Sequence, residues 1–213
     1  MKEVILYTDG ACSFNPGPGG WGCVLICGDE MKEMSGACED TTNNRMELQA
    51  VISGLSALTQ QCKVDIYTDS AYVCNAFQQK WIGNWVRNNW VNSKDEPVAN
   101  KDLWKKLLAE CEKHEIAWHK VKGHADNQLN NRCDELARLE IEKIFEQNPN
   151  IMEELQVKRG AEEAEKASQM DFVATKSADV KSIEELAKLA KDAAEKALEY
   201  IRQIEKAMKG SDN

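Results

Sequence analysis

Tyr7-Thr8-Asp9-Gly10 returns sixty positions later in the chain as Tyr67-Thr68-Asp69-Ser70. Each copy follows a short apolar run, Val4-Ile5-Leu6 or Val64-Asp65-Ile66, which predicts a β-strand that ends in an aspartate. Ligands of open α/β sheets gather at the carboxyl ends of the strands. A single aspartate in such a place is most often a turn-forming residue, but the repetition favours two carboxylates that act together.

The composition is that of a soluble globular protein with one domain and an appendage. The chain has 213 residues, of which 42% are hydrophobic and 30% are charged. Its net charge of -9 by itself argues against a nucleic-acid partner, because phosphate binding favours a basic surface. We find no signal sequence and no apolar run of membrane-spanning length, so we expect a cytoplasmic protein without a membrane partner.

Eight cysteines lie before residue 134, and none forms a Cys-x-x-Cys pair. Without a secretion signal, we expect reduced thiols that act as small hydrophobic residues. A zinc site is an alternative, although its spacing is not a usual one; it would be built from Cys111, His114, His119 and His124.

The first third of the chain predicts an antiparallel meander. Residues 12–20 are rich in turn-forming residues and predict a loop, followed by strands over Trp21–Cys27 and Glu30–Gly36. Gly17, Gly19 and Gly22 match the G-x-G-x-x-G pattern of dinucleotide-binding proteins. That pattern must open a helix, however, and here a strand follows it.

A helix then starts at Thr42, Asn43 or Asn44 and carries Glu47 in its first turn, where an acid also simply suits the helix dipole. The next strand covers Lys63–Tyr67, and a helix follows from Ser70. This order implies a right-handed crossover and a parallel pair between the first and fourth strands. The pairing places Asp9 beside Asp69. The later elements are a helix over Asp102–Lys113, a strand over Glu115–Val121 and a helix over Leu129–Ile144.

Three tryptophans, Trp81, Trp85 and Trp90, punctuate the polar segment over residues 81–101. Aromatic residues interleaved with basic ones are typical of stacking surfaces for nucleic acids. The same tryptophans could equally anchor a helix to the core.

Four acids, Asp9, Glu47, Asp69 and Asp134, stand near predicted strand ends or helix starts that converge. Clustered carboxylates repel one another unless a cation neutralises them, and oxygen ligands suit magnesium. Two such ions can activate a water and stabilise the leaving oxygen of a phosphodiester. The acids therefore predict a hydrolytic nuclease, and bound cations would offset much of the acidic charge.

The chain strongly resembles the type 1 ribonuclease H family, whose members cut the RNA strand of RNA–DNA hybrids. The resemblance covers residues 1–144. It is carried by Tyr7-Thr8-Asp9-Gly10-Ala11, Thr42-Asn43-Asn44-Arg45-Met46-Glu47-Leu48, Tyr67-Thr68-Asp69-Ser70, Trp81-Ile82-Gly83-Asn84-Trp85, Val121-Lys122-Gly123-His124 and Asn131-Arg132-Cys133-Asp134-Glu135-Leu136-Ala137.

The resemblance implies an α/β fold of the ribonuclease H type, a five-stranded mixed sheet flanked by helices. It implies that Asp9, Glu47, Asp69 and Asp134 hold two magnesium ions, with manganese as a substitute, and that cleavage leaves 5′-phosphate and 3′-hydroxyl ends. His124 would help proton transfer or product release. The residues implied to contact the hybrid are Cys12, Asn15, Asn43 and Asn44 in the minor groove and Trp81, Trp85 and Trp90 on the DNA strand.

Two departures from the family pattern concern substrate binding. Ala71 stands where relatives carry a glutamine, and Val86, Asn88 and Asn89 dilute the basic character of the tryptophan segment. We therefore expect weaker hybrid binding with a shallower salt dependence. An integrase- or resolvase-like nuclease and a catalytically silent hybrid-binding module are alternatives; the quoted motifs disfavour the first, and the presence of all four acids disfavours the second.

Beyond residue 144 the resemblance ends. We expect a partly helical linker over residues 145–181, with breaks at Asn148-Pro149-Asn150 and at Gly160, and an amphipathic helix over residues 182–210. Ser182 and Glu185 form a capping box for that helix. Its apolar face needs a partner, which predicts self-association or packing on the catalytic domain. A helix that binds a partner protein and an engineered appendage are the alternatives.

Overall fold

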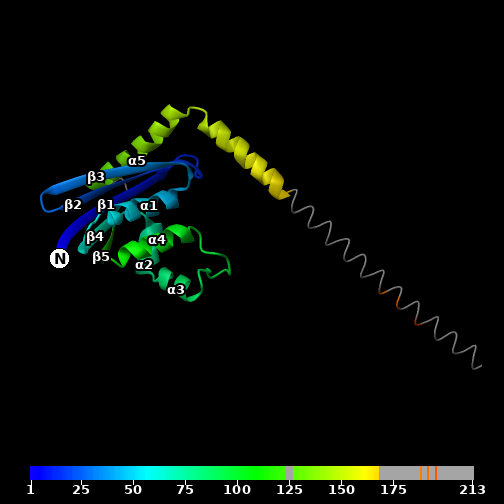
Figure 1. The fold of residues 1–213 in the computed structure, drawn as a ribbon, viewed down its shortest axis with the longest axis horizontal. Coiled ribbons are helices and arrows are strands. Elements are labelled where there is room, and N and C mark those ends of the chain that lie inside the picture. Colours follow the sequence, from blue (N-terminus) through cyan, green and yellow to red (C-terminus); the bar gives the residue numbers. More distant parts are fainter. Residues whose placement is uncertain (123–126, 168–187, 189–190, 192–194, 196–213) are drawn as a thin grey trace, which may run out of the picture. The chain divides into compact units, whose positions relative to one another are not determined.

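The computed structural model describes residues 1–122 and 127–167, together with residues 188, 191 and 195. The chain divides into two compact units, Met1–Leu155 and Gln156–Asn213. The first unit contains a five-stranded sheet of order β3-β2-β1-β4-β5 with helices against it (Figure 1). Its strands are β1 (Lys2–Cys12), β2 (Gly17–Cys27), β3 (Glu30–Thr41), β4 (Cys62–Thr68) and β5 (Glu115–Lys120). Its helices are α1 (Asn43–Ser56), α2 (Ala71–Gln78), α3 (Trp81–Arg87), α4 (Lys101–Cys111) and α5 (Gln128–Gln147).

The sheet is mixed, as predicted. β1 pairs antiparallel with β2 and parallel with β4, while β4 pairs parallel with β5. Tyr7 lies opposite Tyr67, so the two copies of the repeated tetrapeptide are in register. The crossover through α1 therefore brings the two aspartates to neighbouring strands, as the sequence predicts.

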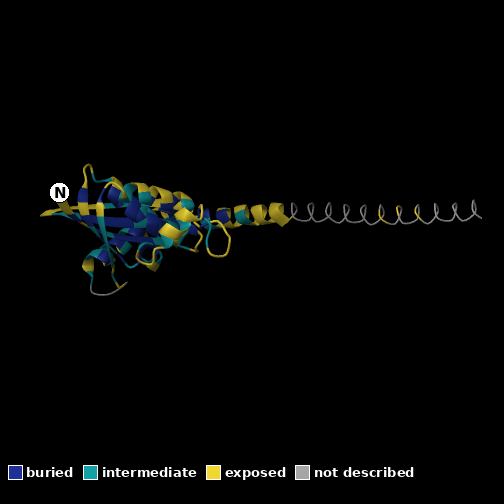
Figure 2. Cartoon of the chain, turned by 90° about the horizontal axis from the view of Figure 1, so that it is seen from below, coloured by how far each residue is buried: buried dark blue, intermediate teal, exposed yellow. Residues whose placement is uncertain are grey.

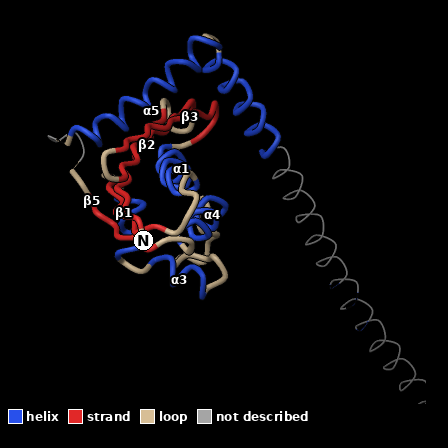
Figure 3. The backbone as a smooth tube through the Cα atoms, turned by 60° about the vertical axis from the view of Figure 1, so that its left-hand side comes forward, coloured by secondary structure: helices blue, strands red, loops and turns tan. Residues whose placement is uncertain are grey.

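Helices cover the two faces of the sheet, with α5 running along β2 and β3 on the side away from α1 (Figure 3). Two glycines allow this close packing. A Cβ at Gly10 would overlap the backbone of Glu47 in α1, and a Cβ at Gly22 would overlap the carbonyl oxygen of Cys133 in α5. Both helices therefore approach the strand backbone directly, which only glycine permits.

Three predicted strand boundaries are wrong. β3 continues to Thr41 instead of ending at Gly36. β2 begins at Gly17 rather than at Trp21. The glycines of this segment do not only form a turn; they also let neighbouring backbone pack closely against the strand. β1 continues to Cys12, so Asp9 lies inside the strand. The parallel pairing with β4 nevertheless stops at Tyr7, and beyond that point β1 pairs with β2 alone.

The core lies between the sheet and helices α1, α2 and α4, where the buried residues concentrate (Figure 2). Trp104 of α4 is fully buried, and its Nε1 donates a hydrogen bond to the hydroxyl of Tyr72 at 3.0 Å. The ring of Trp85 lies 5.4 Å from that of Trp104. The aromatic residues of α2, α3 and α4 therefore form one packed group.

α5 ends at Gln147, before Pro149, as the sequence predicts. Residues 151–167 are helical, so the predicted break at Gly160 is wrong. A glycine costs only about 1 kcal/mol in a helix, and the good helix formers around Gly160 offset that cost. The predicted helix over residues 182–210 lies almost entirely outside the described residues. Within the described part of the chain, no helix is long and apolar enough to cross a membrane.

Candidate active site

Three carboxylates from three different elements meet at one edge of the sheet. Asp9 comes from β1, Asp69 follows directly after β4, and Glu47 comes from α1. One ligand oxygen from each lies within 4.8 Å of the others. In the part of the chain that the structure describes, this is the one group of three or more histidine, cysteine and acidic side chains arranged in this way. The alternative zinc site at Cys111, His114 and His119 is therefore not formed among those residues, and His124 lies outside them.

Two of the three carboxylates are buried. Asp9 is 9% exposed and Glu47 is 6% exposed. Asp9 Oδ1 accepts a hydrogen bond from the backbone N–H of Gly10 at 2.7 Å. Glu47 Oε2 is buried without any hydrogen-bond partner. A buried polar oxygen without a partner is costly, and this one faces other negative groups.

The electrostatics of the cluster favour a bound cation. Burial, reinforced by the charge of Asp69, raises the pKa of Asp9 to about 7. Burial also raises the pKa of Glu47 well above its ordinary value, with further contributions from Asp9 and Asp69. The carboxylates are thus unstable as neighbouring anions without a counter-charge. An oxygen-only donor set with one unsatisfied oxygen fits a hard divalent ion such as magnesium.

Glu47 is not in the first turn of its helix, contrary to prediction. Thr42 is the N-cap residue of α1, and the first turn of α1 contains no acid. Glu47 lies one turn further along, where its side chain turns toward Asp9 and Asp69. The alternative in which Glu47 only complements the helix dipole is therefore disfavoured.

The predicted fourth acid, Asp134, belongs to α5 and lies outside the three-acid group. Its Oδ2 lies 3.0 Å from Nη2 of Arg138, one turn away on the same helix. The charges of both residues act on Asp9: Asp134 raises its pKa and Arg138 lowers it. Sequence reasoning missed Arg138, although the spacing of four residues from Asp134 on a predicted helix would have indicated the pair.

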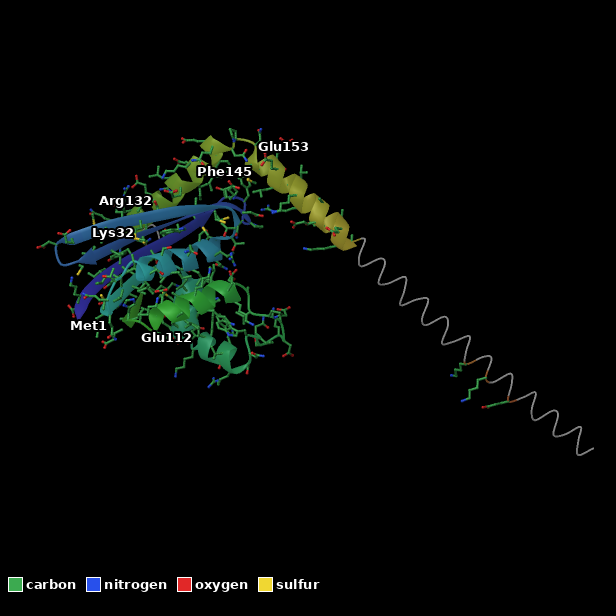
Figure 4. All side chains as sticks on the ribbon, viewed as in Figure 1. Met1, Lys32, Glu112, Arg132, Phe145 and Glu153 are labelled. Atoms are coloured by element: carbon green, nitrogen blue, oxygen red, sulfur yellow. The ribbon has the colours of Figure 1, made fainter. Side chains whose placement is uncertain are left out.

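α5 is fixed on β3 by a second arginine, Arg132, which is labelled in Figure 4. Arg132 pairs with Glu33 of β3 at 2.8 Å and with Glu135 of its own helix at 2.6 Å. Ser35 of β3 also donates a hydrogen bond to Glu140 at 2.9 Å. These contacts, with the glycine packing, set the position of α5 and therefore of Asp134.

Two of the predicted substrate residues meet at the start of α1. Asn15, in the loop between β1 and β2, accepts a hydrogen bond through Oδ1 from the backbone N–H of Asn43 at 2.9 Å. Asn44 is exposed beside it. Cys12 lies near the same place, where its Sγ donates a hydrogen bond to the carbonyl oxygen of Thr41 at 3.3 Å. The four residues thus gather around one loop and one helix start.

The three predicted tryptophans divide into two kinds. Trp81 and Trp85 are half-buried on one face of α3, with ring centroids 6.1 Å apart. They line an open pocket of about 290 Å³ together with Asn84 and Asn88. Trp90 is only 9% exposed and belongs to the core, and Trp81 and Trp85 also pack against that core with part of their surface exposed. The core-anchoring interpretation therefore describes Trp90 best.

Comparisons with known proteins agree with this geometry. Residues 1–142 match the family model described as RNase H. A ribonuclease H of Symbiobacterium thermophilum is 60% identical over 141 residues, which make up 66% of this chain and 96% of that protein. The crystal structure of LC9-RNase H1, a type 1 RNase H with the type 2 active-site motif, superposes with a TM-score of 0.59 at 24% identity and covers 65% of this chain and 71% of that one.

A second crystal structure, that of LC11-RNase H1 in complex with RNA/DNA hybrid, superposes with a TM-score of 0.51 at 25% identity. It covers 67% of this chain and 99% of that one. The sheet order, the carboxylate cluster, the matched family model and the identity to a curated relative all lead to one conclusion. The chain belongs to the type 1 ribonuclease H family over residues 1–142.

Proposed function

We propose that this protein is an endonuclease that hydrolyses the RNA strand of RNA–DNA hybrids and leaves 5′-phosphate and 3′-hydroxyl ends. The observation that carries the proposal is the buried group of Asp9, Glu47 and Asp69 in a member of the ribonuclease H family. LC11-RNase H1, to which the chain is similar, has been crystallised with an RNA/DNA hybrid, which supports the substrate class.

The proposed cofactor is a pair of magnesium ions, for which manganese can substitute, held by Asp9, Glu47, Asp69 and Asp134. The unpaired oxygen of Glu47 and the raised pKa of Asp9 support a bound cation. When bound, such ions supply an activated water and stabilise the leaving oxygen of the phosphodiester.

The chain itself orients the carboxylates and the substrate. The N–H of Gly10 fixes one oxygen of Asp9, so the other remains available as a ligand. His124, which lies outside the described residues, is proposed to help proton transfer or product release, because an imidazole titrates near neutral pH.

The proposed substrate contacts form two sets, one around the start of α1 and one around α3. Cys12, Asn15, Asn43 and Asn44 meet the minor groove, where polar groups distinguish RNA by its 2′-hydroxyls. Trp81 and Trp85 stack against the DNA strand, and Trp90 supports them from the core, with its ring 6.5 Å from that of Trp85.

We propose a catalytic domain over residues 1–144, a partly helical linker over residues 145–181 and a helix over residues 182–210. The cluster of Ile144, Ile151 and Leu155 supports an extension that begins by packing on the end of α5. The proposed role of the final helix is self-association or packing on the catalytic domain. Loss of an oligomer on truncation after Ile144 would support self-association. The proposed location is the cytoplasm.

The test is cleavage of an end-labelled RNA–DNA hybrid in magnesium. Parallel reactions contain single-stranded RNA, duplex RNA, duplex DNA, or the hybrid with EDTA. Cutting confined to the RNA of the hybrid, and absent in EDTA, is the expected result. Equal cutting of duplex DNA, or cutting that survives EDTA, would contradict the proposal.

A further inference from the structure

Phe14 combines two features that are unfavourable for an aromatic residue. Its side chain is 70% exposed, which is the largest exposed fraction among the large hydrophobic residues on the described surface. Its backbone has a φ of 62°, in the left-handed region that favours glycine and is strained for a bulky side chain. Such strain persists only where surrounding structure enforces it, and it clusters at functional sites.

The surrounding loop does enforce this conformation. The backbone N–H of Ser13 donates a hydrogen bond to the carbonyl oxygen of Pro18 at 2.8 Å, which closes the loop on itself. Asn15 is tied to Asn43 at the start of α1. A Cβ at Gly17 would overlap the carbonyl oxygen of Ser13, so the two sides of the loop are in direct contact. These contacts therefore hold the backbone of Phe14 in the left-handed conformation.

Phe14 is placed where an exposed ring can contact the substrate. It lies between Cys12 and Asn15, two of the four residues proposed to meet the minor groove of the hybrid. An RNA–DNA hybrid presents a shallow minor groove lined by sugars, whose carbon-bound faces are apolar. A rigid aromatic ring held out from the loop can cover such a face, and an aromatic side chain loses little conformational entropy on doing so.

We propose that Phe14 is a further substrate-contacting residue, whose ring packs on the sugars of the hybrid minor groove beside Asn15 and Asn43. This inference rests on the proposed function. The loop fixes the backbone of Phe14 with its side chain exposed before the substrate arrives, which reduces the backbone entropy lost on binding.

The test compares the full chain with its Phe14→Gly variant. We expect hybrid binding, measured by fluorescence anisotropy in EDTA so that no cutting occurs, to weaken about fivefold from the lost apolar contact. In magnesium, KM for the hybrid should rise by a similar factor with kcat unchanged. Although binding weakens, the unfolding temperature of the variant should rise, because glycine relieves the backbone strain at this position. A purely structural role for Phe14 would lower the unfolding temperature on substitution.

Two further variants complete the design. Phe14→Tyr keeps the ring and should bind the hybrid as the unchanged chain does. Met31→Ala removes an exposed apolar side chain from β3, 59% exposed, and should leave hybrid binding unchanged. Unchanged binding in Phe14→Gly, or equal weakening in Met31→Ala, would overturn the proposal. Binding without any cleavage by the unchanged chain would count against the proposed function and leave the role of Phe14 standing.

Discussion

Arg138 holds Asp134 in an ion pair, with 3.0 Å between Nη2 of the arginine and Oδ2 of the aspartate. The other three acids bring their oxygens together, while Asp134 stays outside that group. Arg138 also lowers the pKa of Asp9, so its positive charge reaches at least this acid of the cluster. In the proposed metal site, Arg138 would therefore compete with a divalent cation for Asp134 and for the negative potential at Asp9.

Removing this competitor should tighten cation binding. In Arg138→Gln, we expect magnesium to bind up to about fivefold more tightly, because an exposed ion pair contributes about 0.2–1 kcal/mol. Isothermal titration of magnesium into the metal-free protein measures the change.

Arg87→Gln is the control for that titration. It also removes an arginine, but Arg87 lies on α3 and donates a hydrogen bond to Asn84 at 2.6 Å, away from the acid cluster and from α5. Its magnesium affinity should stay that of the unchanged chain. Equal affinities in the two arginine variants would show that Arg138 does not compete for the site.

The stability of the metal-free protein should fall as pH rises from about 5 to 8. The pKa of Asp9 is about 7 in the folded protein and 3.8 ordinarily, so the folded state holds its proton more tightly than the unfolded state. Folding is therefore opposed progressively as pH rises through this window. The unfolding temperature should decrease by several degrees, and added magnesium should raise it more at pH 8 than at pH 5.

The variant Asp9→Asn serves as the control for this pH dependence, because an amide neither titrates nor repels Asp69. Its unfolding temperature should vary less with pH over the same window and should respond less to magnesium. A metal-free protein that becomes more stable toward pH 8 would contradict the raised pKa of Asp9.

The packing of α5 on the sheet should be intolerant of any side chain at Gly20. A Cβ there would overlap the carbonyl oxygen of Ala137 in α5. Gly20→Ala should lower the free energy of unfolding by about 1–3 kcal/mol and slow cleavage, because it displaces the helix that carries Asp134. Urea denaturation and the cleavage rate measure the two effects.

Gly160→Ala is the corresponding control. Nothing lies within 4 Å of a Cβ at Gly160, which is part of a helix. This substitution should be neutral or stabilising by up to about 1 kcal/mol. A loss of stability at Gly160 equal to that at Gly20 would show that the effect does not come from α5 packing.

The sequence predicts the sheet and the carboxylate group well, because both follow from local patterns. The repeated tetrapeptide places Tyr7 opposite Tyr67, and the register between β1 and β4 follows from it. The start of β2 at Gly17 was not predictable in the same way. Glycine favours turns locally. Only the tertiary contacts of these glycines with α5 and with neighbouring backbone show that they lie in a strand packed against other elements.

Other features depend on tertiary contacts that no local pattern contains. The helix start at Asn43 is held by Asn15, a residue from a distant loop, and not by the side chain of its own N-cap residue Thr42. Trp85 and Trp90 look alike in the sequence, but Trp90 is buried in the core whereas Trp85 is only partly buried against it. The choice between stacking surface and core anchor therefore required the structure.

The hybrid affinity of this chain should be only weakly salt-dependent, because its tryptophan segment is poor in basic residues. Asn88 is exposed beside the pocket lined by Trp81 and Trp85. Asn88→Lys should steepen the slope of log affinity against log salt by about 0.9, the value for one added phosphate contact. Gln61 is exposed next to the start of β4, at the end of that strand opposite to Asp69, and Gln61→Lys adds the same charge there. This variant should leave the slope unchanged. Identical slopes in all three proteins would contradict a phosphate path along α3.

The central claim is that the carboxylate group carries out hydrolysis of the hybrid. It is tested most directly by substituting two aspartates, Asp65 on β4 and Asp69 just after it. Asp69→Asn removes a charge from the group, whereas Asp65→Asn alters an aspartate on β4 that pairs with His119 at 2.6 Å. With both variants folded, as judged by circular dichroism, magnesium-dependent cleavage of the hybrid should be lost in Asp69→Asn and kept in Asp65→Asn. Cleavage at the unchanged rate in Asp69→Asn would contradict the assignment.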